Sequence, residues 1–288
     1  MGNTFKTAFL LTAMTLLLMM VGRAFGGQRG MLMALIFAAL INFVSYFFSD
    51  KIALAMYRAQ PVSREDLPRV YNIVERLSQK VGLPMPKVYL IPNDSPNAFA
   101  TGRNPNHASV AVTQGILGIL NDEELEGVLA HELGHVRNRD ILISSVAATI
   151  AGAITYLAHI ARWGMIFGGY GDRNERRGDG GGLAGLLMIF LAPLAATLIQ
   201  LAVSRSREYS ADDTGAHWTG NPYALASALG KIEAYSRRMP LVATPSTAHL
   251  FIIAPFLGGM SFGNLFSTHP PTAKRIERLT GRPAEFTQ

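Results

Sequence analysis

The chain has 288 residues, no cysteine and a net charge of +6, and 49% of its residues are hydrophobic whereas only 16% are charged. The low charged fraction and the mean hydropathy of +0.21 favour an integral membrane protein over a soluble one. The absence of cysteine excludes disulfides and thiolate metal sites, so any metal ion must be bound by histidine and carboxylate side chains.

Two apolar runs open the chain and predict a transmembrane hairpin over residues 5–48. The first run covers residues 7–21, and the second, residues 31–48, has 18 residues without a charge, which is long enough to cross the hydrocarbon layer. A cleaved signal peptide is the alternative for the first run, because that run is N-terminal and of suitable length. Residues 23–26 (RAFG) make a poor cleavage site and a second apolar run follows at once, so we favour a retained hairpin.

The first polar segment, residues 49–140, shows a helical pattern followed by short strand patterns. Apolar residues recur at helical spacing over residues 64–81, and the β-branched stretches 87–91 and 108–113 predict strands. Residues 97–100 fit either a short strand or a loop. Short strands of this kind can form a small sheet, whose edge strand can hold an extended peptide by backbone pairing.

A metal-binding motif, His131-Glu132-Leu133-Gly134-His135, ends this segment. Two histidines four residues apart lie on one face of a helix, so both imidazoles can bind one metal ion. Glu132 between them can accept a proton from the attacking water. Asn121 can cap the helix, with Glu124 returning the hydrogen bond, so the motif has the helical context that it requires. The alternative is a surface helix that carries two histidines by chance.

Two glycines interrupt the same predicted helix. Gly127 and Gly134 each destabilise a helix by about 1 kcal/mol relative to alanine. Their presence predicts the close approach of another backbone, and we expect that backbone to be the substrate-side strand.

Two further apolar runs, residues 141–161 and 183–203, predict a second transmembrane hairpin over residues 141–203. The Gly-rich, charged loop between them lacks the spacing of a phosphate-binding loop. A buried soluble helical hairpin is the alternative for both runs. Four spans place residues 49–140 and 204–288 on one side of the membrane, and the modest excess of Lys and Arg there favours the cytoplasm. The spread of these basic residues suits lipid headgroups rather than nucleic acid.

Two histidines leave a catalytic zinc ion one protein ligand short. Glu208 lies five residues after Val203, where the fourth run ends, and His135 lies five residues before Asp140, where the third begins, so each is about 7.5 Å along a helix from the membrane. Adjacent antiparallel spans would bring them to one depth. Asp212, four residues after Glu208, can accept a hydrogen bond from a histidine ligand. Alternatively, the two carboxylates pair with Arg205 and Arg207 on a solvated helix.

The HELGH motif, a membrane hairpin and the SREYSAD stretch at residues 206–212 together resemble the HtpX-type membrane zinc metalloproteases, relatives of the CAAX prenyl endopeptidases. PNAFATG at residues 96–102 and THPPTAKRIERL at residues 268–279 match the same pattern, and the resemblance covers nearly the whole chain. It implies an α-helical integral membrane protein with four transmembrane helices and a mostly α, α+β zincin-like metalloprotease domain. It also implies proteolytic quality control of bacterial inner-membrane proteins.

The resemblance further implies a role for each motif residue. One Zn²⁺ per chain is expected to be bound by His131, His135 and Glu208, with Glu132 as the general base, Asp212 as their support, and Asn97 and Ala98 at the substrate-binding edge. The expected partners are membrane-protein substrates and the lipid bilayer. The sequence predicts no oligomeric state.

Residues 204–288 are expected to complete the catalytic domain. Residues 222–238 and 272–279 predict helices, and residues 250–257 are either core or membrane-interfacial. His269, Tyr209 and Arg275 are candidates for stabilising the oxyanion, and the sequence does not choose among them.

Two other classes of function are weighed against a protease. A silent scaffold or chaperone with structural zinc would need a fourth side-chain ligand and gives Glu132 no purpose. A zinc transporter would need ligands inside the spans, which hold only His159.

Overall fold

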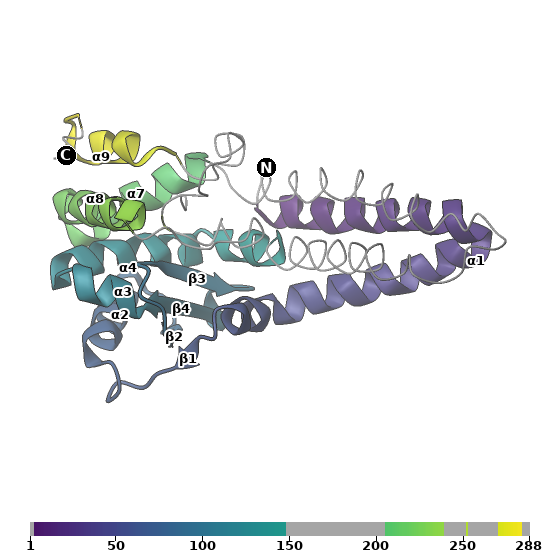
Figure 1. Ribbon diagram of the computed structural model, residues 1–288, viewed down its shortest axis with the longest axis horizontal. Coiled ribbons are helices and arrows are strands. Elements are labelled where there is room, and N and C mark those ends of the chain that lie inside the picture. The colour runs from purple at the N-terminus through teal and green to yellow at the C-terminus, as the bar shows by residue number, and fades with distance from the viewer. Residues whose placement is uncertain (1–2, 148–204, 239–251, 253–269, 284–288) are drawn as a thin grey trace, which may run out of the picture.

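Two apolar arms project from a polar domain in the computed structural model, which describes residues 3–147, 205–238, 252 and 270–283 (Figure 1). Both arms belong to helix α1 (Asn3–Met56), which is interrupted at Gly27, where φ is 58° and ψ is −142°. The arms touch closely beside this turn, since a Cβ on Gly30 would lie 2.2 Å from the Gly22 carbonyl oxygen. Asn42 Nδ2 of the second arm donates to Thr15 Oγ1 of the first at 2.9 Å. The first two apolar runs therefore form a hairpin, as predicted.

The second arm has the length and composition of a membrane span. Residues 26–56 form 31 residues of helix with a mean hydropathy of 2.2, and the described part of the chain contains no other helix that is both long and apolar enough. The first arm is a shorter apolar helix over residues 7–20. Of the predicted second hairpin, only residues 141–147 are described, and they are helical. The count of four spans therefore stays a prediction, and residues 148–203 lie outside the described residues.

The domain contains a four-stranded sheet in the order β1-β2-β4-β3. Strand β2 (Lys87–Ile91) pairs in parallel with β4 (Ala108–Thr113), while β1 (Gln60–Pro61) and β3 (Ala98–Gly102) pair antiparallel to β2 and β4 respectively. A short 3₁₀ turn, Pro105–His107, connects β3 to β4. Of the two alternatives for residues 97–100, the strand is correct, and it is an edge strand of this sheet.

The helices predicted in the described parts of the two polar segments are present, with one shifted start. Helix α2 (Pro68–Val81) begins four residues later than the periodicity indicates, because Ser63 and Asp66 form a hydrogen-bonded turn before it and Pro68 suits the first helical turn. Helix α3 (Gln114–Ile119) follows β4 directly. Helices α8 (Pro222–Arg238) and α9 (Thr272–Thr280) lie where the sequence predicts them.

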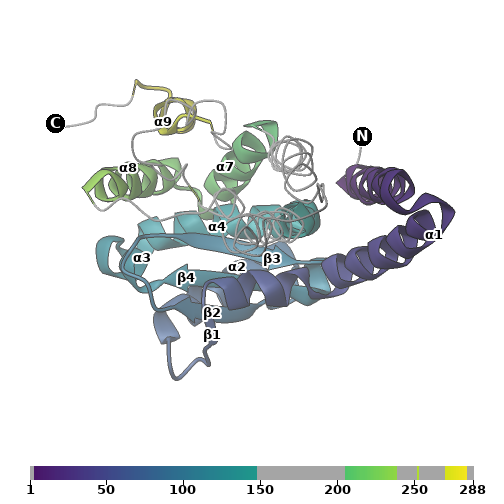
Figure 2. The ribbon, with the colours of Figure 1, turned by 45° about the vertical axis from the view of Figure 1, so that its right-hand side comes forward.

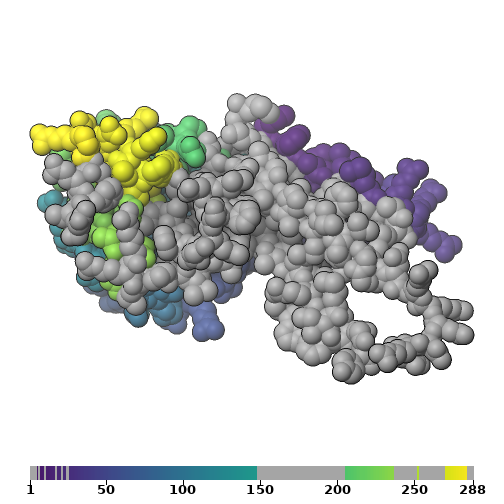
Figure 3. Space-filling model, turned by 45° about the horizontal axis from the view of Figure 1, so that its top comes forward, coloured from purple at the N-terminus to yellow at the C-terminus, as the bar shows by residue number. Residues whose placement is uncertain are grey.

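Helix α4 (Asp122–Arg137) lies between the sheet and the helices of the second polar segment (Figures 1 and 2). Helix α7 (Arg205–Thr219) and α8 pack on the side of α4 away from the sheet, and α9 packs on α7 and α8. Figure 3 shows α9, in yellow, beside the green helices and far from the purple arms. The apolar core joins these layers, with Leu125, Leu129 and Leu133 of α4 fully buried.

The glycines of α4 do allow another backbone to approach, but the expected partner was wrong. A Cβ on Gly127 would lie 3.0 Å from the backbone nitrogen of Leu225 in α8, and a Cβ on Gly134 would lie 3.6 Å from the Cα of Ala211 in α7. The sheet lies on the other side of α4, so the close contacts are with helices. Gly215 of α7 continues this contact, since its Cβ would lie 3.0 Å from the backbone nitrogen of His131.

We predict that Gly215→Ala destabilises the domain, because the added methyl group forces α7 away from α4. Overpacking of this kind costs about 1–3 kcal/mol, so the melting temperature of the detergent-solubilised chain should fall by several degrees. Gly118→Ala in α3 is the control, because its Cβ would meet nothing within 4 Å. An unchanged melting temperature for Gly215→Ala would show that the helices can separate without loss.

Candidate metal centre

The helix that carries the motif starts at a complete capping box. The Asn121 side chain accepts from the Glu124 backbone N–H, and the Glu124 carboxylate accepts from the Asn121 backbone N–H, both at 2.9 Å. The same carboxylate accepts hydrogen bonds from Ser227 and Lys231 of α8. The cap predicted from the sequence thus also fixes α8 against α4, which sets the position of the motif relative to the C-terminal helices.

His131, His135 and Glu208 lie close together, as the sequence predicted. One ligand atom from each lies within 4.8 Å of the other two. His131 Nε2 lies 3.7 Å from Glu208 Oε2, and His135 Nε2 lies 3.6 Å from Glu208 Oε1. These separations are too long for hydrogen bonds and suit three atoms arranged around one ion. All three side chains are largely buried.

A carboxylate lies behind each histidine. His131 Nδ1 lies 2.9 Å from Asp212 Oδ1, a close contact whose angle falls short of a well-aligned hydrogen bond. His135 Nδ1 shares a hydrogen bond of 3.2 Å with Asp140 Oδ2. Such partners hold the proton on Nδ1 and leave Nε2 as the lone-pair donor for a metal. Both Nε2 atoms lie toward Glu208, so these residues fit a metal ion without rearrangement of the ring orientation.

Asp140 is a functional candidate that sequence reasoning missed. We interpreted it only as the residue before the third apolar run, whereas its side chain is buried and bonded to His135. A carboxylate five residues after the second histidine of the motif was the available signal. Helix α4 ends at Arg137, and the turn that follows, in which Arg139 has a φ of 58°, returns Asp140 to the His135 ring.

Glu132 is buried beside both histidines, and its carboxylate is held by the edge strand. Its Oε2 accepts a hydrogen bond of 2.9 Å from the Ala100 backbone N–H. Burial raises the pKa of Glu132 and outweighs the positive charge of His131 and His135, which acts to lower it. A carboxylate with a raised pKa can both take up and release a proton near neutral pH, as a general base requires.

Arg275 of α9, one of the three candidates for stabilising the oxyanion, is bonded to other residues of the centre. Its guanidinium donates to both Asp212 oxygens, at 2.7 and 2.8 Å, and its Nη1 donates to the Ile252 carbonyl oxygen. Arg275 is fully buried. Burial would raise the pKa of Asp212, but the Arg275 charge and its hydrogen bonds outweigh burial and lower that pKa to about 2. Arg275 therefore holds Asp212 charged against His131 and does not offer its donors to an oxyanion.

Asn97 and Ala98, expected at the substrate-binding edge, lie at the start of β3 and are buried. Asn97 Oδ1 accepts from the Ile252 backbone N–H at 3.1 Å, while its backbone groups bond Thr113. Ile252 thus bonds Asn97 through its N–H and Arg275 through its carbonyl. The amide of Asn97 links the edge strand to the Arg275 network, which is a structural contact that the sequence did not indicate.

Of the other two oxyanion candidates, Tyr209 and His269, only Tyr209 is among the described residues. Tyr209 packs its ring under the Arg278 guanidinium, 4.9 Å from ring centroid to Cζ. His269 lies outside the described residues, so its role stays a prediction.

We predict that metal affinity rises with pH between pH 6 and 8. Burial lowers the pKa of His135, but the hydrogen bond to Asp140 and the charge of Glu208 outweigh burial and raise it to about 9. The metal-free ring is therefore protonated at neutral pH, and a metal must displace that proton. The dissociation constant for Zn²⁺, measured by competition with a chromophoric chelator, should fall up to about tenfold per pH unit. Asp140→Asn should flatten this slope, and an equally steep slope in that variant would contradict the assignment.

We predict that Arg275→Met destabilises the chain strongly, because it leaves the Asp212 carboxylate buried without its partner. Breaking a buried pair in this way costs about 3–5 kcal/mol. Arg275→Met combined with Asp212→Asn should recover part of the loss in melting temperature. Arg278→Ala, which breaks the exposed Arg278–Asp213 pair, is the matched control and should leave the melting temperature unchanged. No recovery in the double variant would show that Arg275 acts through packing alone.

Comparison with known proteins identifies the family. The model of peptidase family M48 matches residues 64–283. A "Protease HtpX homolog" of Desulfatibacillum aliphaticivorans is 58% identical over 282 residues, covering 98% of this chain and 90% of that protein. Another, from Syntrophobacter fumaroxidans, is 56% identical and covers 97% of this chain and 99% of its own length.

A solved structure shares the fold. The crystal structure of S. mikatae Ste24p superposes with a TM-score of 0.52 at 19% identity, over 96% of this chain. This chain spans only 65% of that protein's length. With the M48 model matched across the metal centre and full-length relatives above 50% identity, the chain belongs to peptidase family M48.

Proposed function

We propose that the chain is a zinc-dependent endopeptidase that hydrolyses peptide bonds of membrane proteins. The observation that carries this proposal is the convergence of His131, His135 and Glu208 beside a buried Glu132, at an edge strand of a sheet. Membership of family M48 supports a metal-dependent protease. A purely structural metal site does not require Glu132, which lies next to the three ligands without being one of them.

Zinc is the metal that this ligand set favours. Two imidazole nitrogens and one carboxylate leave a tetrahedral zinc ion one open position, which is the arrangement of catalytic rather than structural sites. A zinc ion bound there supplies Lewis acidity, which lowers the pKa of a bound water and polarises a carbonyl group. Asp212 and Asp140 keep the two histidines oriented for that ion.

Glu132 acts as the general base and then as the acid. It takes the proton of the attacking water and passes it to the leaving amine, so one carboxylate serves both proton transfers. Its raised pKa suits both steps, because the protonated form that follows water attack is stable enough to persist until the amine leaves.

Strand β3 holds the substrate. Ala100 and Gly102 direct their backbone N–H groups away from β4, toward Glu132 and Ser145 respectively. An extended substrate segment added along this edge, beginning near Asn97 and Ala98, would accept these hydrogen bonds through its carbonyl groups. The Ala100 N–H would then leave Glu132, which frees the carboxylate to face the scissile bond.

The substrates are membrane proteins, and the role is their quality control at a bacterial inner membrane. The apolar second arm of α1 and the HtpX-type relatives support a membrane-associated protease. The proposal includes four membrane spans with the catalytic domain in the cytoplasm. Strand β3, whose Ala100 N–H bonds Glu132, also contacts α1, which suits segments at the membrane surface.

We predict that Glu132→Gln keeps the metal and abolishes cleavage, whereas Glu208→Ala loses the metal. The amide that replaces the Glu132 carboxylate cannot accept the water's proton, so turnover of a membrane-protein substrate in proteoliposomes should fall at least about 100-fold. Glu208→Ala removes one of the three ligands, so elemental analysis should find little zinc in the purified variant.

Two outcomes would contradict this function. Wild-type turnover by Glu132→Gln would remove Glu132 from the chemistry, and chelator-resistant cleavage by the wild-type chain would exclude a metal peptidase. Equal turnover of a soluble unfolded protein in detergent would contradict the membrane-protein substrate class while leaving the peptidase assignment intact. A metal-loaded chain that cleaves neither substrate would favour the silent scaffold.

A further inference from the structure

A cluster of aromatic and basic side chains marks the domain end of the second α1 arm. Tyr46, Phe47 and Phe48 lie together, with the rings of Tyr46 and Phe47 5.0 Å apart, and Lys51 Nζ lies 5.3 Å from the Phe48 ring. Aromatic rings mixed with lysine are typical of the headgroup level of a membrane. From the turn at Gly27 to Tyr46 the helix rises about 28 Å, close to the roughly 30 Å of a bilayer's hydrocarbon layer. Tyr46 therefore lies at the depth of the phosphates.

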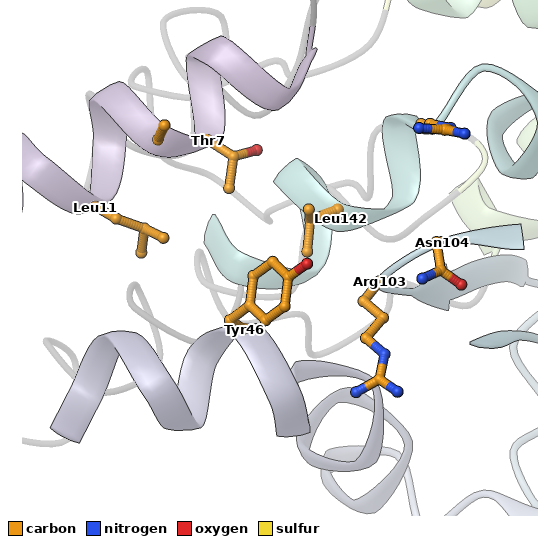
Figure 4. Close-up of a pocket in the computed structure, with 8 residues that line it drawn as sticks. Thr7, Leu11, Tyr46, Arg103, Asn104 and Leu142 are labelled. Carbon is orange, nitrogen blue, oxygen red and sulfur yellow. The ribbon is translucent and has the colours of Figure 1, made fainter. Parts of the chain in front are cut away.

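A pocket of about 290 Å³ opens at this depth, between the two arms and the domain (Figure 4). Thr7 and Leu11 line it from the first arm, Tyr46 from the second, and Leu142 from the helix after α4. The domain adds polar side chains, Arg103, Asn104 and Arg139. The volume is at the lower end of the range of small-molecule pockets, which suits a headgroup rather than a whole lipid.

The two arginines bring positive charge to the pocket that no carboxylate of the described residues neutralises. Arg103 stacks on Phe47, 5.5 Å from Cζ to the ring centroid, and neither Arg103 nor Arg139 forms an ion pair within the described part of the chain. Some cations elsewhere in the domain pair with carboxylates, namely Arg64 with Glu75, Arg69 with Asp122, Arg76 with Glu126, Lys231 with Glu124 and Arg278 with Asp213, while others, such as Lys87 and Arg137, have no ion pair within the described residues. The charge at the pocket is thus available to an anion.

The backbone at Arg139 supports a dedicated site. Its φ of 58° is in the left-handed region, which non-glycine residues rarely adopt and which recurs at functional positions. This conformation occurs in the turn that follows α4. It lets Arg139 line the pocket while the next residue, Asp140, bonds His135.

We propose that this pocket binds the phosphate of an anionic phospholipid from the leaflet next to the domain. Arg103 and Arg139 contact the phosphate, and the Tyr46 hydroxyl and Asn104 amide contact the glycerol backbone. The acyl chains lie along the exposed apolar side chains of the two arms, which include Phe9, Phe43 and Phe47. A soluble phosphate would match the arginines but not this continuous apolar surface, so the occupant is a lipid.

Lipid retention tests the proposal. The full-length chain is placed in nanodiscs of equal parts phosphatidylglycerol and phosphatidylcholine, extracted into mild detergent, and the retained lipids are counted by native mass spectrometry. We expect the wild-type chain to retain phosphatidylglycerol preferentially. Each arginine near an anionic lipid is worth roughly fivefold in affinity, so the double variant Arg103→Gln, Arg139→Gln should lose roughly twentyfold.

Control variants separate this site from general membrane charge. Arg23→Gln with Arg29→Gln removes the same charge at the exposed tip of the hairpin and should keep phosphatidylglycerol retention at the wild-type level. The single variants Arg103→Gln and Arg139→Gln keep the test usable if the double variant does not fold, and each should lose roughly fivefold.

Three results would overturn the proposal. Equal retention by wild type and the Arg103/Arg139 variants would show that the pocket holds no lipid. Displacement of the lipid by millimolar inorganic phosphate would favour a soluble phosphate as the occupant. Unchanged retention together with a raised KM for a peptide substrate would assign the pocket to the substrate instead.

Discussion

The close crossing of α4 and α7 is the constraint on which the rest of the structure depends. Gly215 lets the α7 backbone lie against the backbone of His131, and Gly134 faces Ala211 one turn further along the contact. Larger side chains at this crossing would increase the distance between the axes of α4 and α7. Glu208, one turn before Ala211, would then be out of reach of the imidazoles, because a glutamate side chain cannot span that added distance.

The close crossing also explains why the charged groups of the centre can be buried. Asp212 and Glu208 lie on the same face of α7, so both are removed from water when α7 meets α4. Burying carboxylates is unfavourable unless they are paired, and Asp212 is paired by Arg275, which is supplied by the last helix of the domain. Helix α9 packs Ile276 and Leu279 against the apolar core, and its Arg275 connects it to the metal centre.

Local patterns predicted most of the centre from the sequence. The spacing of His131 and His135 and the Asn121 cap report helical geometry, which depends on near neighbours in the chain, whereas Glu208 was expected from how the apolar runs would pack and from the family resemblance. Arg275 was not predictable in this way, because its contact with Asp212 joins residues 63 positions apart and depends on how α9 packs. The prediction of which backbone approaches Gly127 and Gly134 was wrong for the same reason. A glycine signals a close approach but not which element approaches.

The two elements that build the catalytic centre also end at the junction with α1. The chain leaving β3 runs into Arg103, and the chain leaving α4 turns at Arg139 into the helix of residues 140–147. Thr101 and Ser145 share a buried hydrogen bond of 2.7 Å, so the ends of these two elements are fixed to each other. Under the proposed function, a substrate segment paired along β3 would lie beside α1, which β3 contacts. The proposed preference for peptide bonds next to a membrane span rests on this contact between the edge strand and α1.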